Sequence, residues 1–191
     1  MLPLAPGSNL AVVGPFAADP GLLFSDYAGF PEKGTQHKAL PSCQPSIAEG
    51  IRAANVGGTT TSATRIPVAS TPSSWNASAV AAALALVKGA DATVLTLGIS
   101  RSEEHEGIDR ADTRLPPNQT AFAHAVFAAA AGKPVMLLLI SGGMVSVDGL
   151  IDSAGAIVEA FNPGQQGPVA LGQLLLGAEN PVGEDATHRV R

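Results

Sequence analysis

Short apolar stretches alternate along this chain with longer segments in which apolar residues recur at helical spacing. The short stretches predict β-strands at 9–13, 92–97, 135–140 and 156–161, of which 92–97 and 135–140 are expected to be buried, with a further short strand near 58–61. The longer segments predict α-helices at 46–54, 79–88, 118–131 and 169–176. Between residues 16 and 74 the chain is rich in Pro, Gly, Ser and Thr, so most of this third is predicted to be loop.

Local signals suggest where several of these elements begin and end. Gly14 and Pro15 follow the first apolar stretch and predict that its strand ends near residue 13. Ser78 and Asn118 are predicted to cap the amino ends of the second and third helices with their side-chain oxygens. Pro168 suits the first turn of the last helix, because proline fixes a helical φ and lacks only an N–H that would be unpaired there.

Strands that are apolar on both faces and alternate with helices are typical of a parallel sheet that is covered on both sides. We therefore predict the α/β class, as a three-layer sandwich with a mostly parallel sheet and helices on both faces. Parallel strands joined by right-handed crossovers point the same way, so the loops that follow them gather at one sheet edge, where ligands bind in such folds. That edge is expected to collect the segments 14–15, 99–117, 141–143 and 162–165.

Length and composition narrow the classes of function. The 191 residues suit one domain, at roughly 100–200 residues per domain, and a hydrophobic content of 46% supports a buried core. The net charge of −5 and the lack of a basic run argue against a nucleic-acid partner. The longest apolar stretches, 79–87 and 134–140, fall far short of the roughly 20 residues of a membrane helix, so a soluble protein with no membrane partner is predicted. Cys43 is the only cysteine, which excludes an internal disulfide and leaves the cellular compartment open.

The segment 99–117 holds eight of the 27 charged residues of the chain. Clustered carboxylates repel one another, which raises the pKa of at least one of them, and a carboxyl group that stays protonated near neutral pH can act as a general acid. The alternative interpretation is a solvated surface loop whose charges pair with one another. The segment contains Arg101, Glu103, Glu104, His105, Glu106, Asp109, Arg110, Asp112 and Arg114.

Other chemistries have weaker support. The segment from Glu104 to Asp109 contains oxygen and imidazole ligands but no second histidine at metal spacing, so no metal site is predicted. The chain has neither a dinucleotide fingerprint nor a phosphate-binding loop, and no cofactor is predicted. Ser141 follows a strand but stands outside a Gly-x-Ser-x-Gly elbow, so it is interpreted as a turn residue rather than a nucleophile.

Several motifs in order along the chain resemble one family. The ordered motifs are Ala11-Val12-Val13-Gly14-Pro15, Asp26-Tyr27-Ala28-Gly29, Gly98, Glu104-His105-Glu106-Gly107-Ile108-Asp109-Arg110, Leu115-Pro116-Pro117-Asn118-Gln119, Ser141-Gly142-Gly143, Asn162-Pro163-Gly164-Gln165-Gln166-Gly167 and Asn180-Pro181-Val182-Gly183. Together they resemble the C-terminal α/β-sandwich domain of glycoside hydrolase family 3, in its β-xylosidase and β-glucosidase branch. The resemblance runs from about residue 2 to residue 183.

The resemblance implies a function shared between two domains. In that family a TIM-barrel domain supplies an aspartate nucleophile, and the sandwich domain lends a loop glutamate as general acid/base. The match assigns this role to Glu104, with Glu106 as the second candidate, and makes Asp109 and Arg110 loop-shaping residues. The implied reaction is retaining hydrolysis of β-linked glucosides or xylosides, with the two carboxyl groups roughly 5–5.5 Å apart. Most of the sugar-binding residues are expected in the barrel, and members of the family are often secreted.

The resemblance also sets an expectation for domain organisation. Residues 1–183 are predicted to form the sandwich domain and 184–191 a divergent tail, with the barrel absent, as in a fragment. A chain without the nucleophile is expected to be inactive alone. Two alternatives stay open: a stand-alone flavodoxin-like module that binds a small molecule or a protein partner at the same sheet edge, and a fragment without function.

Overall fold

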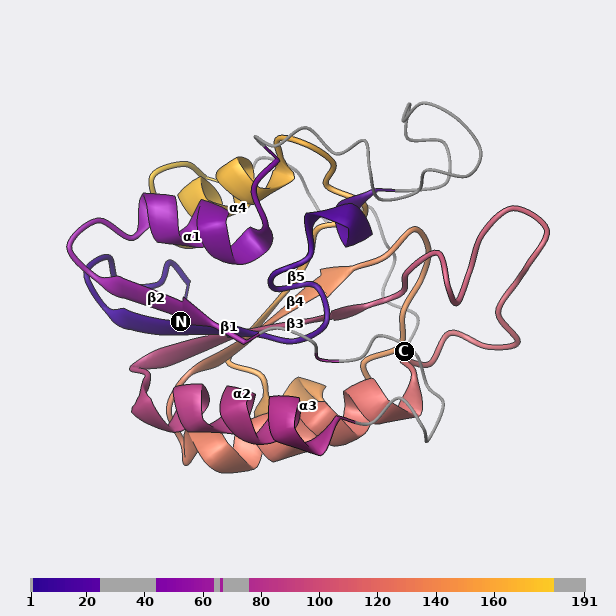
Figure 1. Ribbon diagram of the computed structural model, residues 1–191, viewed down its shortest axis with the longest axis horizontal. Coiled ribbons are helices and arrows are strands. Elements are labelled where there is room, and N and C mark those ends of the chain that lie inside the picture. The colour runs from indigo at the N-terminus through magenta and orange to yellow at the C-terminus, as the bar shows by residue number, and fades with distance from the viewer. Residues whose placement is uncertain (1, 25–43, 64–65, 67–75, 181–191) are drawn as a thin grey trace.

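A five-stranded parallel sheet forms the middle layer of the chain (Figure 1). The structure is a computed structural model that describes residues 2–24, 44–63, 66 and 76–180. The strands lie in the order β2-β1-β3-β4-β5, so that β3 is central. Their bounds are β1 Asn9–Val13, β2 Thr59–Ser62, β3 Ala92–Gly98, β4 Val135–Ile140 and β5 Ala156–Glu159. The parallel sheet predicted from the apolar stretches is confirmed.

Helices cover both faces of the sheet and complete three layers. Figure 1 shows α1 and α4 on one face and α2 and α3 on the other. Their bounds are α1 Ile47–Ala54, α2 Ala77–Gly89, α3 Pro117–Ala130 and α4 Gly167–Leu175, with short 3₁₀ helices η1 at Pro20–Leu23 and η3 at Ile151–Ser153. Among the described helices, none has both the length and the apolar character needed to cross a membrane.

The central strands are largely apolar because each of their faces contributes to a separate core, and the two threonines of β3, Thr93 and Thr96, are buried as well. On β3, Val94 faces the cluster beneath α1 and α4, and Leu95 faces the cluster beneath α2 and α3. On β4, Met136 and Leu137 alternate in the same way. Successive side chains of a strand point to opposite faces, so in a strand covered on both sides neither face meets solvent. This packing explains the continuous apolar run over 135–140.

The structure corrects two predicted helix caps. Helix α2 is capped by Asn76, whose side-chain oxygen accepts from the backbone N–H of Ala79 at 3.1 Å, and the Ser78 hydroxyl donates to the same oxygen. Helix α3 begins at Pro117, so Asn118 lies in its first turn instead of capping it. Proline at the first helical position fixes φ and needs no N–H partner, which lets the helix start one residue before Asn118 without a side-chain cap.

The described α-helices and strands begin and end within two residues of the predicted positions. Pro168 lies in the first turn of α4, as expected. Strand β5 ends at Glu159, before the predicted end at 161, because the chain turns at Phe161 with φ of +53°. Some sequence features lie outside the described residues, namely Asp26-Tyr27-Ala28-Gly29, Cys43, Pro181-Val182-Gly183 and the tail 184–191.

The strand order places the charged segment at a specific point of the sheet. In the order β2-β1-β3-β4-β5 the chain leaves β1 toward one side and β3 toward the other, so their carboxyl ends flank a topological switch point. Crevices outside this point are the usual ligand sites of open α/β sheets. The loop of residues 99–116, which follows β3 and precedes α3, leaves the sheet here.

Candidate functional site

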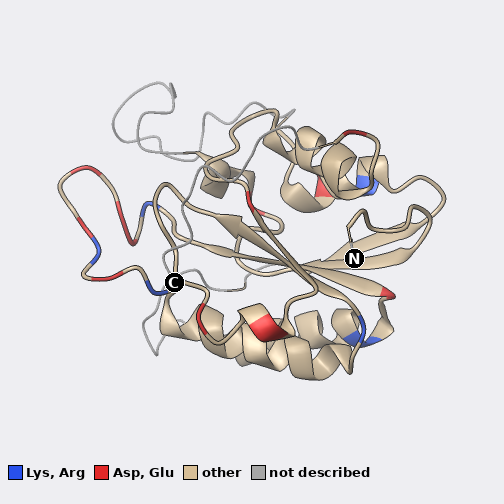
Figure 2. Cartoon of the chain, turned by 180° about the vertical axis from the view of Figure 1, so that it is seen from behind, with Lys and Arg blue, Asp and Glu red and all other residues tan. Residues whose placement is uncertain are grey.

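The 99–116 loop projects from the carboxyl end of the central strand and carries charges of both signs. Figure 2 shows acidic and basic residues following one another along this projection, while most of the remaining ribbon carries neither. Three parts of the loop can be distinguished, which are a turn at its base, a hairpin at its tip and a returning segment with an exposed ion pair. Each part gives its carboxylates a different environment.

The base of the loop is a turn whose hydrogen bonds engage both carboxylate oxygens of Glu103. One carboxylate oxygen of Glu103 accepts from the backbone N–H of Ser100 at 3.0 Å and from its hydroxyl at 2.6 Å. The other accepts from the Ser102 hydroxyl at 2.7 Å. The backbone N–H groups of Glu103 and Glu104 both donate to the carbonyl of Ser100. Glu103 therefore stabilises the turn from which the rest of the loop extends.

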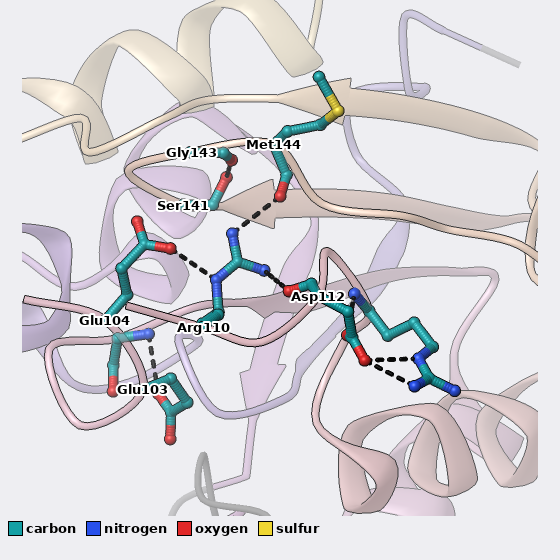
Figure 3. Close-up of polar contacts among 9 residues, drawn as sticks. Glu103, Glu104, Arg110, Asp112, Ser141, Gly143 and Met144 are labelled. Atoms are coloured by element: carbon teal, nitrogen blue, oxygen red, sulfur yellow. Dashed lines mark hydrogen bonds and ion pairs between the residues drawn. The ribbon is translucent and has the colours of Figure 1, made fainter. Parts of the chain in front are cut away.

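Glu104 forms an ion pair with Arg110 across the loop (Figure 3). The Nε of Arg110 donates to Oε2 of Glu104 at 2.6 Å. The two terminal nitrogens of the same guanidinium donate to the backbone carbonyls of Asp112, at 3.3 Å, and Met144, at 2.9 Å. Met144 belongs to the segment after β4, so the guanidinium joins the loop to a neighbouring strand end. The Arg110 side chain is only 13% exposed and that of Glu104 is 33% exposed.

The tip of the loop is a tight hairpin turn. The backbone groups of His105 and Ile108 bond to each other in both directions, at 3.1 and 2.9 Å, and leave Glu106 and Gly107 as the two central residues. Gly107 has φ of +84°, a conformation that glycine adopts without the steric cost of a Cβ. Glu106 and the following Asp109 are both exposed. The second candidate acid therefore lies at the apex of the loop.

The returning segment contains a second ion pair, which is exposed. Arg114 donates to the Asp112 carboxylate from Nε at 2.9 Å and from a terminal nitrogen at 2.6 Å. These hydrogen bonds hold the pKa of Asp112 below its ordinary value. The shift is opposite in direction to the one expected from clustered carboxylates, because the Asp112 carboxylate accepts hydrogen bonds from an arginine. For these two residues the self-paired interpretation of the loop is correct.

The neighbouring strand ends carry a buried serine and a half-buried carboxylate. The Ser141 hydroxyl donates to the carbonyl of Gly143 at 2.8 Å, as expected of a turn residue. Glu159, at the end of β5, accepts from the backbone N–H of Phe161 at 2.8 Å and lies 3.3 Å from the Ser141 hydroxyl. Burial raises the pKa of Glu159 above its ordinary value. Sequence reasoning missed this residue, because it stands inside a segment interpreted as an apolar strand.

The raised pKa of Glu159 predicts a pH-dependent stability. A carboxyl group whose pKa is higher in the folded state favours folding fully below its ordinary value of 4.5, and this contribution is lost as pH rises through the raised pKa. Glu159→Gln keeps an oxygen acceptor for Phe161 and removes the charge. Urea unfolding of both proteins from pH 4 to pH 8 should show the variant to be the more stable at pH 8, with the difference shrinking toward pH 4. A difference independent of pH would contradict this origin.

Beside the loop, the described residues form a surface pocket but no metal-binding cluster. Within the parts of the chain described above, no three His, Cys, Asp or Glu side chains lie together as a group that could hold a metal ion. A surface pocket lies between the loop and α3, with Glu103, Arg110 and His124 among its lining residues. Neither Glu104 nor Glu106 lines this pocket.

Comparison with known proteins gives the family of this fold and loop. Residues 1–187 match the sequence model of the glycosyl hydrolase family 3 C-terminal domain. The chain belongs to this family. The resemblance that the motifs suggested is therefore confirmed over nearly the whole chain.

Relatives of this family 3 domain include β-xylosidases and β-glucosidases. β-D-xylosidase 3 of Arabidopsis thaliana is 31% identical over 95% of the chain, and probable β-D-xylosidase 7 of the same plant is 38% identical over 55%. Among solved structures, a β-glucosidase of Listeria innocua in complex with isofagomine superposes with a TM-score of 0.78 at 28% identity and 95% coverage. The chain spans 22% and 14% of the two plant proteins and 23% of the Listeria chain.

The fold of this family 3 domain brings together some of the predicted site residues and separates others. Glu104 and Arg110, six positions apart in the motif, are in direct contact. Asp109 precedes Arg110 but is exposed, and Glu106 stands at the hairpin apex. Opposite charges at the two ends of a short motif were a signal for the ion pair. The anchoring of Arg110 to Met144 had no such signal, because a backbone carbonyl accepts hydrogen bonds whatever its side chain.

Proposed function

We propose that this family 3 domain is part of a retaining β-glycosidase that acts on β-linked glucosides or xylosides. Its part in the reaction is to supply the general acid/base carboxylate from the 99–116 loop. The observation that carries the proposal is an ordered loop at the carboxyl end of the central strand that holds carboxylates in or near solvent. Relatives named as β-xylosidases and β-glucosidases support the choice of substrates.

The proposed mechanism needs a second carboxylate from another domain. A nucleophilic aspartate attacks the anomeric carbon while the loop carboxylic acid protonates the oxygen of the leaving group, and a covalent glycosyl-enzyme forms. The loop carboxylate, now deprotonated, takes a proton from water, which attacks the anomeric carbon and releases the sugar with its original configuration. We propose that residues 1–183 form the acid/base domain and that a TIM barrel carries the nucleophile. The domain alone then catalyses no turnover.

Two residues are candidates for the acid/base. The resemblance favours Glu104, with Glu106 second. Both lie between the base turn and Arg110, so either can be presented by the same loop. They differ in environment, since Glu104 is paired with a largely buried arginine and Glu106 is exposed at the apex.

The test uses an enzyme in which this domain is joined to its nucleophile domain, with Glu104 and Glu106 both replaced by alanine. General acid/base catalysis contributes about 10²–10⁴-fold, so hydrolysis of alkyl glycosides, which have poor leaving groups, should fall by that factor. Activated aryl glycosides should lose less. Azide should restore cleavage by occupying the vacated space and attacking the glycosyl-enzyme.

The matched control is Asp152→Asn, which removes an exposed carboxylate from η3, before β5 and away from the loop. It should retain wild-type rates on both substrates. If the double variant hydrolysed alkyl glycosides as fast as the wild type, the acid/base would not lie on this loop, and the proposal would be wrong.

A further inference from the structure

We propose that Phe161 is a specificity-determining residue, whose ring stacks on the leaving-group half of a β-linked disaccharide, and that the chain holds it in a strained backbone conformation for this purpose. The inference rests on the proposed function for the identity of the substrate. The strain, and the contacts that maintain it, belong to this chain alone.

The backbone of Phe161 lies in the left-handed region, with φ of +53°. A bulky residue is rare there, because its Cβ crowds the following carbonyl oxygen. Among the described residues other than glycine, Ala131 alone shares a positive φ. Ala131 ends α3, and a left-handed residue is a common way for a helix to end. Phe161 ends no helix, so its conformation needs another explanation.

Two hydrogen bonds hold the peptide groups of Phe161 in this conformation. Its N–H donates to Oε1 of Glu159 at 2.8 Å, and its carbonyl accepts from the backbone N–H of Ser141 at 3.2 Å. Ser141 is fully buried and Glu159 is half-buried, so both partners are fixed by the sheet edge around them. Strained residues persist where the surroundings determine their conformation in this way, and they cluster at ligand sites.

Packing of the ring does not account for the strain. Phe161 is 52% exposed, whereas Phe16 and Phe122 are buried. Of the aromatic residues that the structure describes, no other is exposed. Glycine at this position would accept both hydrogen bonding partners without steric cost. A phenylalanine that is strained and yet gains little from burial is typical of a residue kept for contact with a ligand.

Phe161 stands next to the loop that carries the candidate acid/base residues. The residue after it, Asn162, reaches the glycines that follow β4, and the loop reaches the same glycines. A Cβ on Gly142 would lie 3.1 Å from the side-chain nitrogen of Asn162 and 4.0 Å from Oε1 of Glu104. The segment after β5 and the 99–116 loop therefore meet across Gly142 at the carboxyl edge of the sheet.

This position selects the leaving-group half of the substrate. A general acid protonates the oxygen of the leaving group, so side chains beside it on the same domain face that half. The C–H groups of a pyranose ring form an apolar face, which can lie against an aromatic side chain as apolar ligand surfaces do in binding pockets. A phenyl ring has no hydrogen-bonding group, so Phe161 should favour a leaving group that has a ring over methanol.

The strain is tested by urea unfolding of the 191-residue chain. Phe161→Gly removes the ring and the strain, whereas Phe161→Ala removes the ring and keeps a Cβ in the left-handed region. Phe161→Gly should raise the unfolding midpoint by at least about 0.3 M urea over the wild type and Phe161→Ala, because the relief exceeds the extra entropy of glycine in the unfolded chain. The matched control, Ala131→Gly, should show a similar rise. An equal or lower midpoint for Phe161→Gly would overturn the strain, whatever the function of the domain.

The specificity is tested in the two-domain enzyme with a β-linked disaccharide and a methyl glycoside of the same sugar. Both Phe161 variants should lower kcat/KM for the disaccharide about 3–10-fold and leave kcat/KM for the methyl glycoside unchanged, since methanol offers no ring to stack on. Ala131→Gly should leave both values unchanged.

Two results would overturn the role of Phe161 and leave the proposed function in place. One is an active enzyme whose Phe161 variants cleave the disaccharide as fast as the wild type does. The other is an equal loss on both substrates, which would mean that Phe161 only shapes the site. A wild-type two-domain enzyme that cleaves neither substrate would instead overturn the proposed function, and with it the substrate assigned to Phe161.

Discussion

Replacement of Gly98 by alanine is expected to abolish folding of the chain, although it adds a single methyl group. A Cβ at this position would lie 1.8 Å from the carbonyl oxygen of Ile140 and 2.7 Å from its carbonyl carbon. Both atoms belong to the backbone of β4, which is fixed by its own pairing with β3, so neither can move aside without breaking the centre of the sheet. Gly98 also has φ of +154°, which disfavours any side chain. A loss of more than about 4 kcal/mol is expected, in the range of severe core defects.

The matched control for Gly98→Ala separates the close approach from the backbone conformation. Gly57 has φ of +80° but nothing within 4 Å of its Cβ position. Gly57→Ala should therefore cost only about 1–2 kcal/mol, the penalty of placing a Cβ in the left-handed region. Circular dichroism in buffer shows whether Gly98→Ala folds at all, and urea unfolding measures the loss in Gly57→Ala and in any Gly98→Ala that does fold. If they proved equally stable, the contact with Ile140 would not be the reason for glycine at position 98.

The close approach at Gly98 matters for function because the charged loop begins one residue later. In the sheet, the N–H of Ile99 donates to the carbonyl of Ile140 at 2.9 Å, so pairing with β4 continues into the first residue of the loop. The packed backbone of β3 and β4 therefore helps to set the direction in which the loop leaves the sheet. The ion pair of Glu104 and Arg110 then fixes the loop a second time, through the hydrogen bond from Arg110 to the Met144 carbonyl.

The strands were predictable because their sequence signal and their burial coincide. The six residues of β4 are all buried, and the apolar run 135–140 has the same bounds. Strand β1 was also predicted with its observed bounds, since Gly14-Pro15 ends it. The α/β class and the family follow from such local signals taken in order along the chain.

The errors have an equally local origin. Asn118 is a good capping residue, but the preceding proline already starts the helix, so propensity at one position was overridden by its neighbour. The sequence shows which residues of the loop are charged, but it does not show how deeply each charged side chain is buried. Arg110 and Arg114 look alike in sequence, yet one is 13% exposed and the other 81% exposed. The Arg110 side chain donates to the Met144 carbonyl in the segment after β4, whereas the Arg114 side chain donates to Asp112 on its own loop.

Contacts between a side chain and a distant backbone were the part of the site least accessible to sequence reasoning. Gln119 was noted only as the last letter of a motif. In the structure it is buried in the first turn of α3 and lies against Gly98, which is 21 positions earlier. Gln119 bonds to the backbone of Gly98, and every residue type except proline has the same backbone groups. The sequence pattern therefore could not predict this contact.

Gln119→Leu is expected to destabilise the chain by about 2–5 kcal/mol and to loosen the start of the loop. The Gln119 amide accepts from the N–H of Gly98 and donates to its carbonyl, both at 2.8 Å. In a parallel sheet, the backbone N–H and carbonyl groups of successive residues point alternately to the strand on one side and to the strand on the other. The N–H of Ile99 donates to β4, so the N–H and carbonyl of Gly98 face away from β4. Strand β1, the neighbour on that side, ends at Val13, which pairs with Leu95, so Gln119 supplies the partner that the sheet no longer provides.

Leucine has nearly the volume of glutamine, so Gln119→Leu mainly leaves two buried peptide groups of Gly98 without partners, at about 1–3 kcal/mol each. The control is Gln173→Leu on α4, where the side chain is exposed and the change should stay within about 0.5 kcal/mol. Chemical denaturation measures both, and amide exchange at Gly98 and Ile99 reports the local effect. In the two-domain enzyme, Gln119→Leu should lower kcat for all leaving groups alike, since it shifts the loop without removing its proton carrier. A loss confined to poor leaving groups would mean that Gln119 acts on the acid itself, and unchanged stability would mean that the Gly98 peptide finds other partners.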